Sequence, residues 1–184
     1  MRTPAMFSTL KSDLERHWDG QRGLAGNLME LGLTQGVWAT VVFRLGQWVY
    51  ADARPAQIRT AFKLAYKVAA KCVEVTTGIS VPASARIDQG FYIGHFGAII
   101  VHPRTVMGRG CSVGQGVTIG TRGQGSVGVP VLGDNVYVGA GAKVLGGIRI
   151  GDNVAIGANA VVVQDVPANS VAVGVPARIK PRRG

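Results

Sequence analysis

Residues 131–162 read VLGDNVYVGAGAKVLGGIRIGDNVAIGANAVV, and in this stretch an aliphatic side chain returns every six positions. With the segment before it, ten positions keep this spacing, broken once by a loop: Val101, Met107, Val113, Ile119, Leu132, Val138, Val144, Ile150, Ile156 and Val162. Glycine follows seven of the ten. A helix repeats its apolar positions about every 3.6 residues and a simple strand about every two, so neither keeps this register. The period predicts a solenoid of short strands with a tight corner after each buried aliphatic.

A second series of small or branched side chains lies four residues after the first. Its members are Thr105, Cys111, Val117, Val136, Ala142, Ile148, Val154 and Ala160. Because Cys111 belongs to this series, we expect it to be a buried thiol that acts as a small apolar side chain. Cys72 is the only other cysteine, so the chain is not a disulfide scaffold, and a reducing cytoplasm is the expected location.

The chain has 184 residues, enough for one domain and a small second element. Residues 1–75 are predicted to form an α-helical N-terminal region, with helices over 10–18, 34–50 and 56–75. Residues 76–184 are predicted to form the β-helix domain, which includes a protruding loop at 121–130 and a basic C-terminal tail. The start of the chain lacks the apolar core of a secretory signal, and no run reaches the ~20 apolar residues of a membrane span.

The formal net charge of +10 is concentrated at two places. Arg59, Lys63, Lys67 and Lys71 recur every fourth residue of one predicted helix, and Arg178, Lys180, Arg182 and Arg183 end the chain. We expect the helix to pack an apolar face of Ile58, Phe62, Ala65, Ala69 and Val73 on the solenoid; contact with a membrane surface is the less favoured alternative. For the tail, phosphate binding and plain solvation are equally supported. No motif supports nucleic-acid binding.

The repeat breaks where His95 lies, and such breaks are where functional segments are inserted. Ile93 and Val101 are eight residues apart instead of six, and His95 lies between them in the sequence GHFG. An imidazole, with a pKa of about 6.5, is suited to take a proton from a hydroxyl group. His95 and His102 are therefore the catalytic candidates, whereas His17, in the helical region, is expected to be structural.

Five segments share their order and spacing with one known family. They are residues 90–95 (GFYIGH), 116–120 (GVTIG), 133–146 (GDNVYVGAGAKVLG), 150–158 (IGDNVAIGA) and 173–178 (VGVPAR). The chain resembles the bacterial serine O-acetyltransferases, which are hexapeptide-repeat acyltransferases, over about residues 35 to 180. The resemblance implies a left-handed parallel β-helix, assembly as a homotrimer, and a site in the groove between two prisms. The family also joins two trimers through a longer helical region, so the choice between trimer and hexamer stays open.

The resemblance further implies an O-acetyltransferase with acetyl-CoA as donor. No metal is expected, because the separated histidines lack Cys or carboxylate partners at ligand spacing. His95 would be the general base on the acceptor hydroxyl in a direct transfer. Residues of the later coils and the tail would hold the donor: Gly139, Ala140, Gly157 and Ala158 along the pantetheine arm, and Arg178 and Lys180 at the phosphates. L-Serine is the expected acceptor, which would give O-acetyl-L-serine for cysteine biosynthesis.

Two charged positions of the family's amino-acid site are missing. Gly94 replaces the Asp that precedes the catalytic histidine, and residues 128–129 (GV) replace an Arg-His pair in the loop. Asp19 matches a further family Asp, and Arg122 and His102 are candidates to replace the lost guanidinium and imidazole. An amino-acid zwitterion needs both a cation and an anion. An acceptor hydroxyl on a sugar or polysaccharide precursor is therefore the second hypothesis, and a noncatalytic scaffold is the third.

Overall fold

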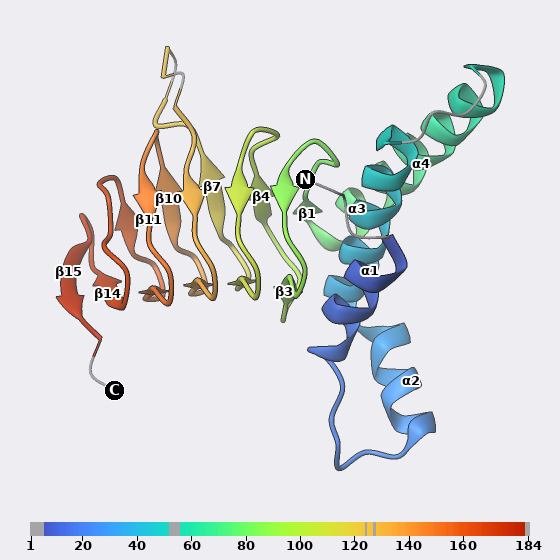
Figure 1. Ribbon diagram of the computed structural model, residues 1–184, viewed down its shortest axis with the longest axis horizontal. Helices are drawn as coiled ribbons and strands as arrows, with labels where there is room; N and C mark the ends of the chain where they lie inside the picture. Colours follow the sequence, from blue (N-terminus) through green and yellow to red (C-terminus); the bar gives the residue numbers. More distant parts are fainter. Residues whose placement is uncertain (1–5, 52–55, 124, 127, 183–184) are drawn as a thin grey trace.

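The computed structural model describes residues 6–51, 56–123, 125–126 and 128–182, which form a helical part and a prism of strands (Figure 1). The helices of this described part are α1 (Met6–Glu15), α2 (Leu24–Leu33), α3 (Gln35–Ala51) and α4 (Ala56–Thr77). Three of them overlap the predicted helical segments. The sequence did not predict α2, because Gly26 and Gly32 lower its helix propensity. None of the described helices combines the length and apolarity that a membrane crossing requires.

The strands are short, and from β1 to β13 every third strand belongs to the same sheet, whereas β14 and β15 both extend the third sheet. The first sheet contains β1 (Ile79–Ser80), β4 (Ile99–Val101), β7 (Thr118–Gly120), β10 (Lys143–Leu145) and β13 (Val161–Val162). The second contains β2 (Arg86–Ile87), β5 (Val106–Met107), β8 (Val131–Leu132) and β11 (Arg149–Ile150). The third contains β3 (Tyr92–Ile93), β6 (Ser112–Val113), β9 (Tyr137–Val138), β12 (Ala155–Ile156), β14 (Ser170–Val173) and β15 (Arg178–Pro181). This order, with parallel pairing between successive coils, confirms the predicted parallel β-helix behind a small helical region.

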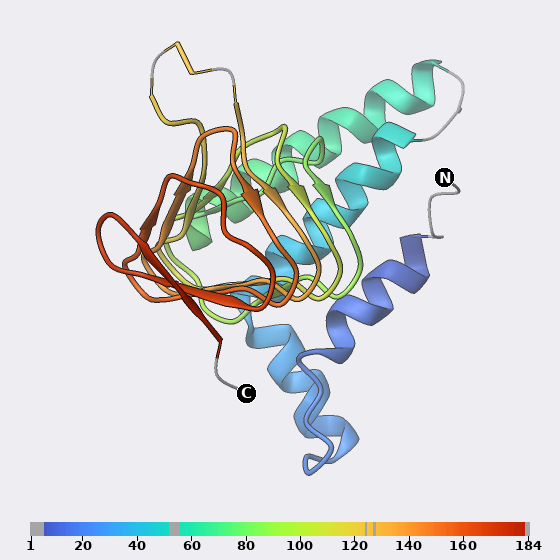
Figure 2. The same cartoon turned by 60° about the vertical axis from the view of Figure 1, so that its left-hand side comes forward.

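Successive coils lie one behind another, so the two series found in the sequence fill one continuous core (Figure 2). Every member of the aliphatic series is at most 2% exposed, and every member of the second series at most 8%. Cys111 is buried as predicted, and this burial raises the pKa of its thiol to about 11. The thiol therefore stays protonated and unreactive at neutral pH.

Glycine follows the buried aliphatic because the next coil lies directly against each corner. A Cβ on Gly139 would lie 2.7 Å from the backbone nitrogen of Ala158, and one on Gly114 would lie 2.8 Å from that of Ala140. These distances are too short for any side chain. The recurring glycine thus follows from the close approach of successive coils.

The helices cover the open end of the first coil, whose backbone groups have no preceding coil to pair with. Arg44 of α3 donates to the carbonyl oxygens of Ile87 and Asp88, both at 2.7 Å. Asp13 of α1 accepts a hydrogen bond from the Phe91 amide at 2.8 Å. The two side chains form an ion pair of 2.7 Å and are at most 3% exposed. At the other end, β15 pairs antiparallel with β14 and ends the third sheet.

The basic helix α4 packs on the solenoid through a face that only partly coincides with the predicted one, since Val73 packs on the core and Ala69 is half-buried. Tyr66 accepts a hydrogen bond from the Ala83 amide at 3.2 Å, and Val73 packs against the core. Phe62 stacks edge-on against Trp48, but Ala65 is exposed, and the side chains of residues 58 and 59 lie outside the described residues. The packed face also includes Tyr66, whose hydroxyl reaches a backbone donor that the apolar pattern alone does not indicate.

The close contact between coils predicts that a corner glycine is needed for stability. In Gly151→Ala the new Cβ would meet the Ala168 nitrogen and lie 2.7 Å from its Cα. We expect the free energy of unfolding, measured in urea, to fall by about 1–3 kcal/mol. Gly32→Ala is the control, because nothing lies within 4 Å of its Cβ position; it should be neutral or gain up to about 1 kcal/mol. Equal effects of the two variants would contradict this account.

The buried ion pair makes a second prediction. Asp13→Ala leaves the Arg44 guanidinium buried without its counter-charge, and should destabilise the chain by about 3–5 kcal/mol in the same experiment. Lys71→Ala is the comparison, since it removes one partner of the exposed Lys71–Glu74 pair and should cost at most about 1 kcal/mol. A loss below about 1 kcal/mol for Asp13→Ala would show that the pair does not hold the helices on the prism.

Candidate active site

His95 lies in the turn between β3 and β4, and its side chain is exposed. The two extra residues of this turn give Gly97 and Ala98 positive φ angles of 106° and 51°. The backbone is held from both sides: the Gly97 amide donates to the Thr77 carbonyl at the end of α4 (2.9 Å), and the Gly97 carbonyl accepts from Gly116 of the next coil (2.7 Å). An accessible imidazole is thus carried on a fixed turn.

The turn of His95 is the first in a column along one edge of the prism. The turns after β6, β9 and β12 follow it, and backbone hydrogen bonds join them from Gly141 to Gln115 (2.7 Å) and from Asn159 to Ala140 (2.8 Å). Residues in these turns are mostly glycine and alanine, so little side chain covers the backbone. Four predicted donor-binding residues belong to this column: Gly139, Ala140, Gly157 and Ala158.

The two predicted phosphate-binding cations lie at the far end of the molecule from α1–α4, in strand β15 (Figure 1). Arg178 pairs with Val173 and Lys180 with Val171 across the β14–β15 ladder. Because they are two residues apart in a strand, their side chains leave the same face of the ladder. Both are exposed, and the column of turns reaches them through Gly174, whose carbonyl accepts from Val161 at 3.0 Å.

His102 and Arg122 lie at a different edge of the prism. His102 follows the end of β4, and its Nδ1 accepts a hydrogen bond from the Arg104 amide at 3.1 Å. Its Cβ lies 3.8 Å from the Cβ position of Gly120, and that of Arg122 lies 3.7 Å from the position of Gly146. The three-residue strand β4, at about 3.3 Å per residue, separates this edge from His95. Within one chain these residues are therefore not brought together with His95.

Asp19 lies between α1 and α2, in a cavity of about 380 Å³. The cavity is lined by Arg16, His17, Trp18, Asp19, Arg22, Glu30 and Tyr92. Tyr92 belongs to β3 and connects this cavity to the turn of His95. A Cβ on Gly94 would lie 3.1 Å from Tyr92 Cε1, so the ring fills the space beside Gly94. The repeat pattern did not single out Tyr92, although this residue stands three positions before His95.

His17 and Arg16 attach this cavity to the prism. The His17 ring stacks on Tyr92 with 4.4 Å between ring centres, in line with its expected structural role. Arg16 donates to the carbonyl oxygens of Gly90 (2.7 Å) and Gly110 (2.9 Å) and to Ser112 Oγ (3.0 Å). Burial, followed by the nearby Arg16 charge, lowers the pKa of His17 below its ordinary 6.5. The wall of the cavity is therefore rigid, and its imidazole is neutral near pH 7.

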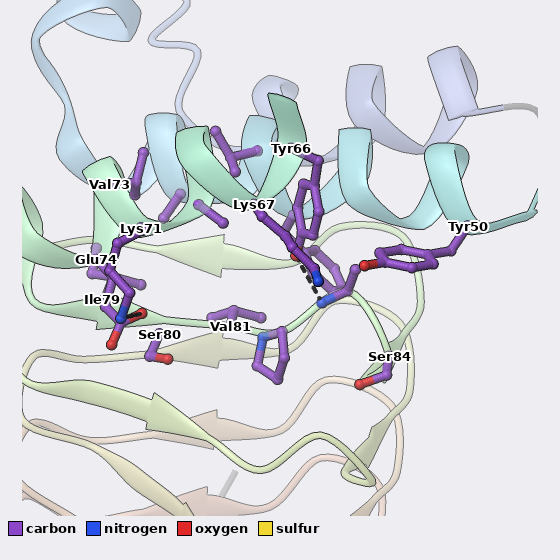
Figure 3. A pocket seen from close by; sticks show the side chains of 16 residues that line it. Tyr50, Tyr66, Lys67, Lys71, Val73, Glu74, Ile79, Ser80, Val81 and Ser84 are labelled. Carbon is purple, nitrogen blue, oxygen red and sulfur yellow. Dashed lines mark hydrogen bonds and ion pairs between the residues drawn. The ribbon is translucent and has the colours of Figure 1, made fainter. Parts of the chain in front are cut away.

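A second cavity, of about 550 Å³, lies between α3, α4 and the segment from Ile79 to Ser84 (Figure 3). Figure 3 shows Lys67 and Lys71 of the basic helix at its side, with Tyr66 and Val81 among the lining residues. None of the predicted site residues lines it. The candidate active site is therefore the His95 edge together with the cavity of Asp19.

Comparisons with known proteins agree with this geometry. A family model described as "Bacterial transferase hexapeptide (six repeats)" matches residues 130–164. The serine acetyltransferase of Synechococcus elongatus is 36% identical over 180 residues, which cover 97% of this chain and 70% of that protein. The chain belongs to the serine acetyltransferase family. Other curated members of the family match over 42 to 60% of their own length.

Solved structures of serine acetyltransferases have the same fold. The Neisseria gonorrhoeae enzyme in complex with serine gives a TM-score of 0.77 at 29% identity, covering 95% of this chain and 69% of that one. The Brucella abortus enzyme in complex with coenzyme A gives 0.80 at 27% identity, covering 97% and 68%. The family inferred from the five sequence segments is confirmed.

The lowered pKa of His17 predicts a pH dependence of stability. The unfolded chain binds a proton at His17 near pH 6.5, whereas the folded chain binds it only at lower pH. Stability from this group is therefore present above pH 6.5 and is lost as the pH falls toward the folded pKa. We expect His17→Phe, which keeps a ring against Tyr92, to lose less unfolding free energy than the parent chain below pH 6.5. Parallel curves of unfolding free energy against pH would rule this out.

Proposed function

We propose that this member of the serine acetyltransferase family transfers the acetyl group of acetyl-CoA to the hydroxyl group of L-serine, giving O-acetyl-L-serine and CoA. The observation that carries the proposal is the exposed His95 on its fixed turn, at the start of a column of small-residue turns. The 36% sequence identity to a serine acetyltransferase, over 97% of this chain, supports L-serine as the acceptor.

In this proposal His95 is the general base. Its imidazole takes the proton of the serine hydroxyl as the oxygen attacks the thioester carbonyl carbon. Backbone amides of the glycine-rich turns stabilise the negative charge on the carbonyl oxygen. The carbon–sulfur bond then breaks, the imidazolium returns its proton to the CoA sulfur, and the acetyl group remains on the serine oxygen. No acyl-enzyme is formed.

Acetyl-CoA is a substrate in this reaction and supplies the activated acetyl group. The turns that contain Gly139, Ala140, Gly157 and Ala158 suit its narrow pantetheine arm, because their side chains are absent or small. Arg178 and Lys180 share one face of β15 and are exposed, so they suit its phosphates. His95 and these cations lie at opposite ends of one edge, as an extended donor requires.

We further propose that the active site forms between two chains of a homotrimer in the cytoplasm. His102 and Arg122 lie at another edge from His95, so they can meet its substrate only when a second chain brings them. Leu24, Leu28, Met29 and Leu33 of α2 are 57 to 67% exposed, which favours contact with another copy. If the other copy belongs to a second trimer, contact through α2 would give a dimer of trimers.

A hydroxyl group on a sugar or polysaccharide precursor is the second candidate acceptor. It is favoured by Gly94, which offers no carboxylate beside His95, and by the Tyr92 ring that fills the adjacent space. A polyhydroxylated acceptor has no charge that such a carboxylate would need to bind. The two candidates share the donor and the base, so an acceptor assay separates them.

The proposed base gives the test of function. We expect His95→Ala to lower kcat/KM by about 10²- to 10⁴-fold, because the proton of the attacking hydroxyl loses its acceptor. The measurement is thiol release from acetyl-CoA with L-serine or with a series of nucleotide sugars and glycans as acceptors. Acetyl-CoA affinity and the thermal unfolding temperature should stay unchanged, since His95 is exposed.

The outcomes of this assay are distinct. Turnover with L-serine that His95→Ala abolishes supports the proposal, and turnover only with a sugar acceptor replaces serine by the second candidate. Absence of acetyl-CoA binding, with no effect of His95→Ala in the cell, would favour a noncatalytic scaffold.

A further inference from the structure

The cavity of about 550 Å³ between α3, α4 and the segment from Ile79 to Ser84 is lined by none of the candidate active-site residues (Figure 3). Its volume lies within the roughly 300–1,000 Å³ of protein sites that bind small molecules. Most of its lining side chains are apolar, and all three elements contribute them, among them Val42, Val73 and Val81. The cavity therefore suits the apolar body of a small ligand.

The aromatic side chains of the cavity are fixed by packing. Tyr66 lies over Gly46 of α3, where even a Cβ would collide with the tyrosine ring. The Tyr66 hydroxyl oxygen accepts a hydrogen bond from the Ala83 amide at 3.2 Å. Tyr50 stands edge-on to the Tyr66 ring with 5.8 Å between ring centres, and the Lys63 ammonium lies 5.0 Å from the centre of the Tyr50 ring. A wall that is ordered before a ligand arrives lowers the entropic cost of binding.

The wall also carries a positive charge that no carboxylate balances. Lys71 pairs with Glu74 at 3.0 Å, so these two charges offset each other. Lys67 has no hydrogen-bond or ion-pair partner among the residues that the structure describes. Figure 3 shows its side chain extending from α4 toward the segment between Val81 and Ser84. An ammonium group beside an apolar cavity favours an anionic ligand.

Tyr66, the neighbour of Lys67 in the chain, supplies a second donor to the same cavity. Its oxygen accepts from Ala83, and its own hydrogen goes to no acceptor within the described part of the chain. Burial raises the pKa of Tyr66 above its ordinary value of 10.0, so the hydroxyl group stays protonated at neutral pH. One ammonium and one hydroxyl donor match the two oxygens and the single charge of a carboxylate, whereas a dianionic phosphate would keep one charge unbalanced.

We propose that this cavity binds a small organic monocarboxylate with an apolar body, such as the anion of a medium-chain fatty acid. Lys67 and Tyr66 bind the carboxylate, and the chain lies along the apolar side chains between α3 and α4. Because the ligand contacts α3, α4 and β1 together, it stabilises the packing of the helical part on the prism. The site is independent of the proposed function, since it shares no residue with the candidate active site.

Calorimetric titration of the full chain with hexanoate, octanoate and decanoate tests the apolar part of the site. The affinity should rise about three- to fourfold for each added CH₂ group, because each group removes further apolar surface from water. Octanoate should also raise the thermal unfolding temperature, since it binds the folded chain. 1-Octanol has the same chain without the charge and should bind about 3- to 10-fold more weakly.

Two substitutions separate the charge from the cavity. Lys67→Gln should weaken octanoate binding about 3- to 10-fold and remove the preference for octanoate over 1-octanol, because the ammonium group is lost. Ala70→Phe places a ring in the cavity and should abolish the binding of both compounds. Lys11→Gln is the matched control, since Lys11 forms an exposed pair with Glu15 on α1, does not line the cavity and should not affect binding. Circular dichroism checks the fold of each variant, and Lys67→Gln changes only an exposed side chain.

Four results would overturn the assignment. They are an affinity that does not rise with chain length, an octanoate affinity that Lys67→Gln leaves unchanged, displacement of octanoate by coenzyme A, and binding to phosphatidylglycerol vesicles without binding of free octanoate. The third would place the carboxylate in the proposed donor groove, and the fourth would assign the lysines of α4 to a membrane surface. None of these measurements depends on acetyl transfer, so their failure leaves the proposed function untouched.

Discussion

The contact between successive coils is the constraint on which this structure depends. Parallel strands pair at about 4.8 Å, so each corner has room for backbone and little else. This spacing requires glycine at positions such as Gly114 and Gly139, where a Cβ would meet the next coil. It also keeps the turns of one edge in line, and a straight edge bordered by small residues can hold an extended substrate. The fold and the proposed donor groove therefore have one cause.

A stack of coils has two ends, and this chain closes them differently. At the start, the buried Asp13–Arg44 pair forms hydrogen bonds with backbone groups of the first coil. Apolar packing alone would leave these groups without hydrogen-bond partners. The same contact fixes α1 and α3 relative to β3. The loop after α1, which carries Asp19 and Arg22, is thereby held beside the strand that leads to His95. Stability of the first coil and the shape of the cavity that contains Asp19 are therefore coupled.

The sequence predicted what local periodicity encodes. All ten aliphatic positions are buried, and the irregular spacing around His95 marks a turn that departs from the others. It did not reveal α2, whose glycines weaken the helix signal, or the contribution of Tyr66 to the packed face of α4. Nor could it relate Arg22 to Tyr92, because residues 70 positions apart meet only through the capping helices. Contacts between the two parts of the chain leave no period to detect.

The last strand, β15, limits the length of the donor that this edge of the prism can hold. Between the turn of His95 and the turn at Gly174, three further turns follow along the same edge, after β6, β9 and β12. With four steps of about 4.8 Å each, the turn of His95 and the turn at Gly174 stand about 19 Å apart, and the cations of β15 lie one strand further on. The number of coils thus sets the length of the groove. Adding or removing one coil would change the distance between the turn of His95 and the last turn by one inter-strand spacing, without altering the residues at either end.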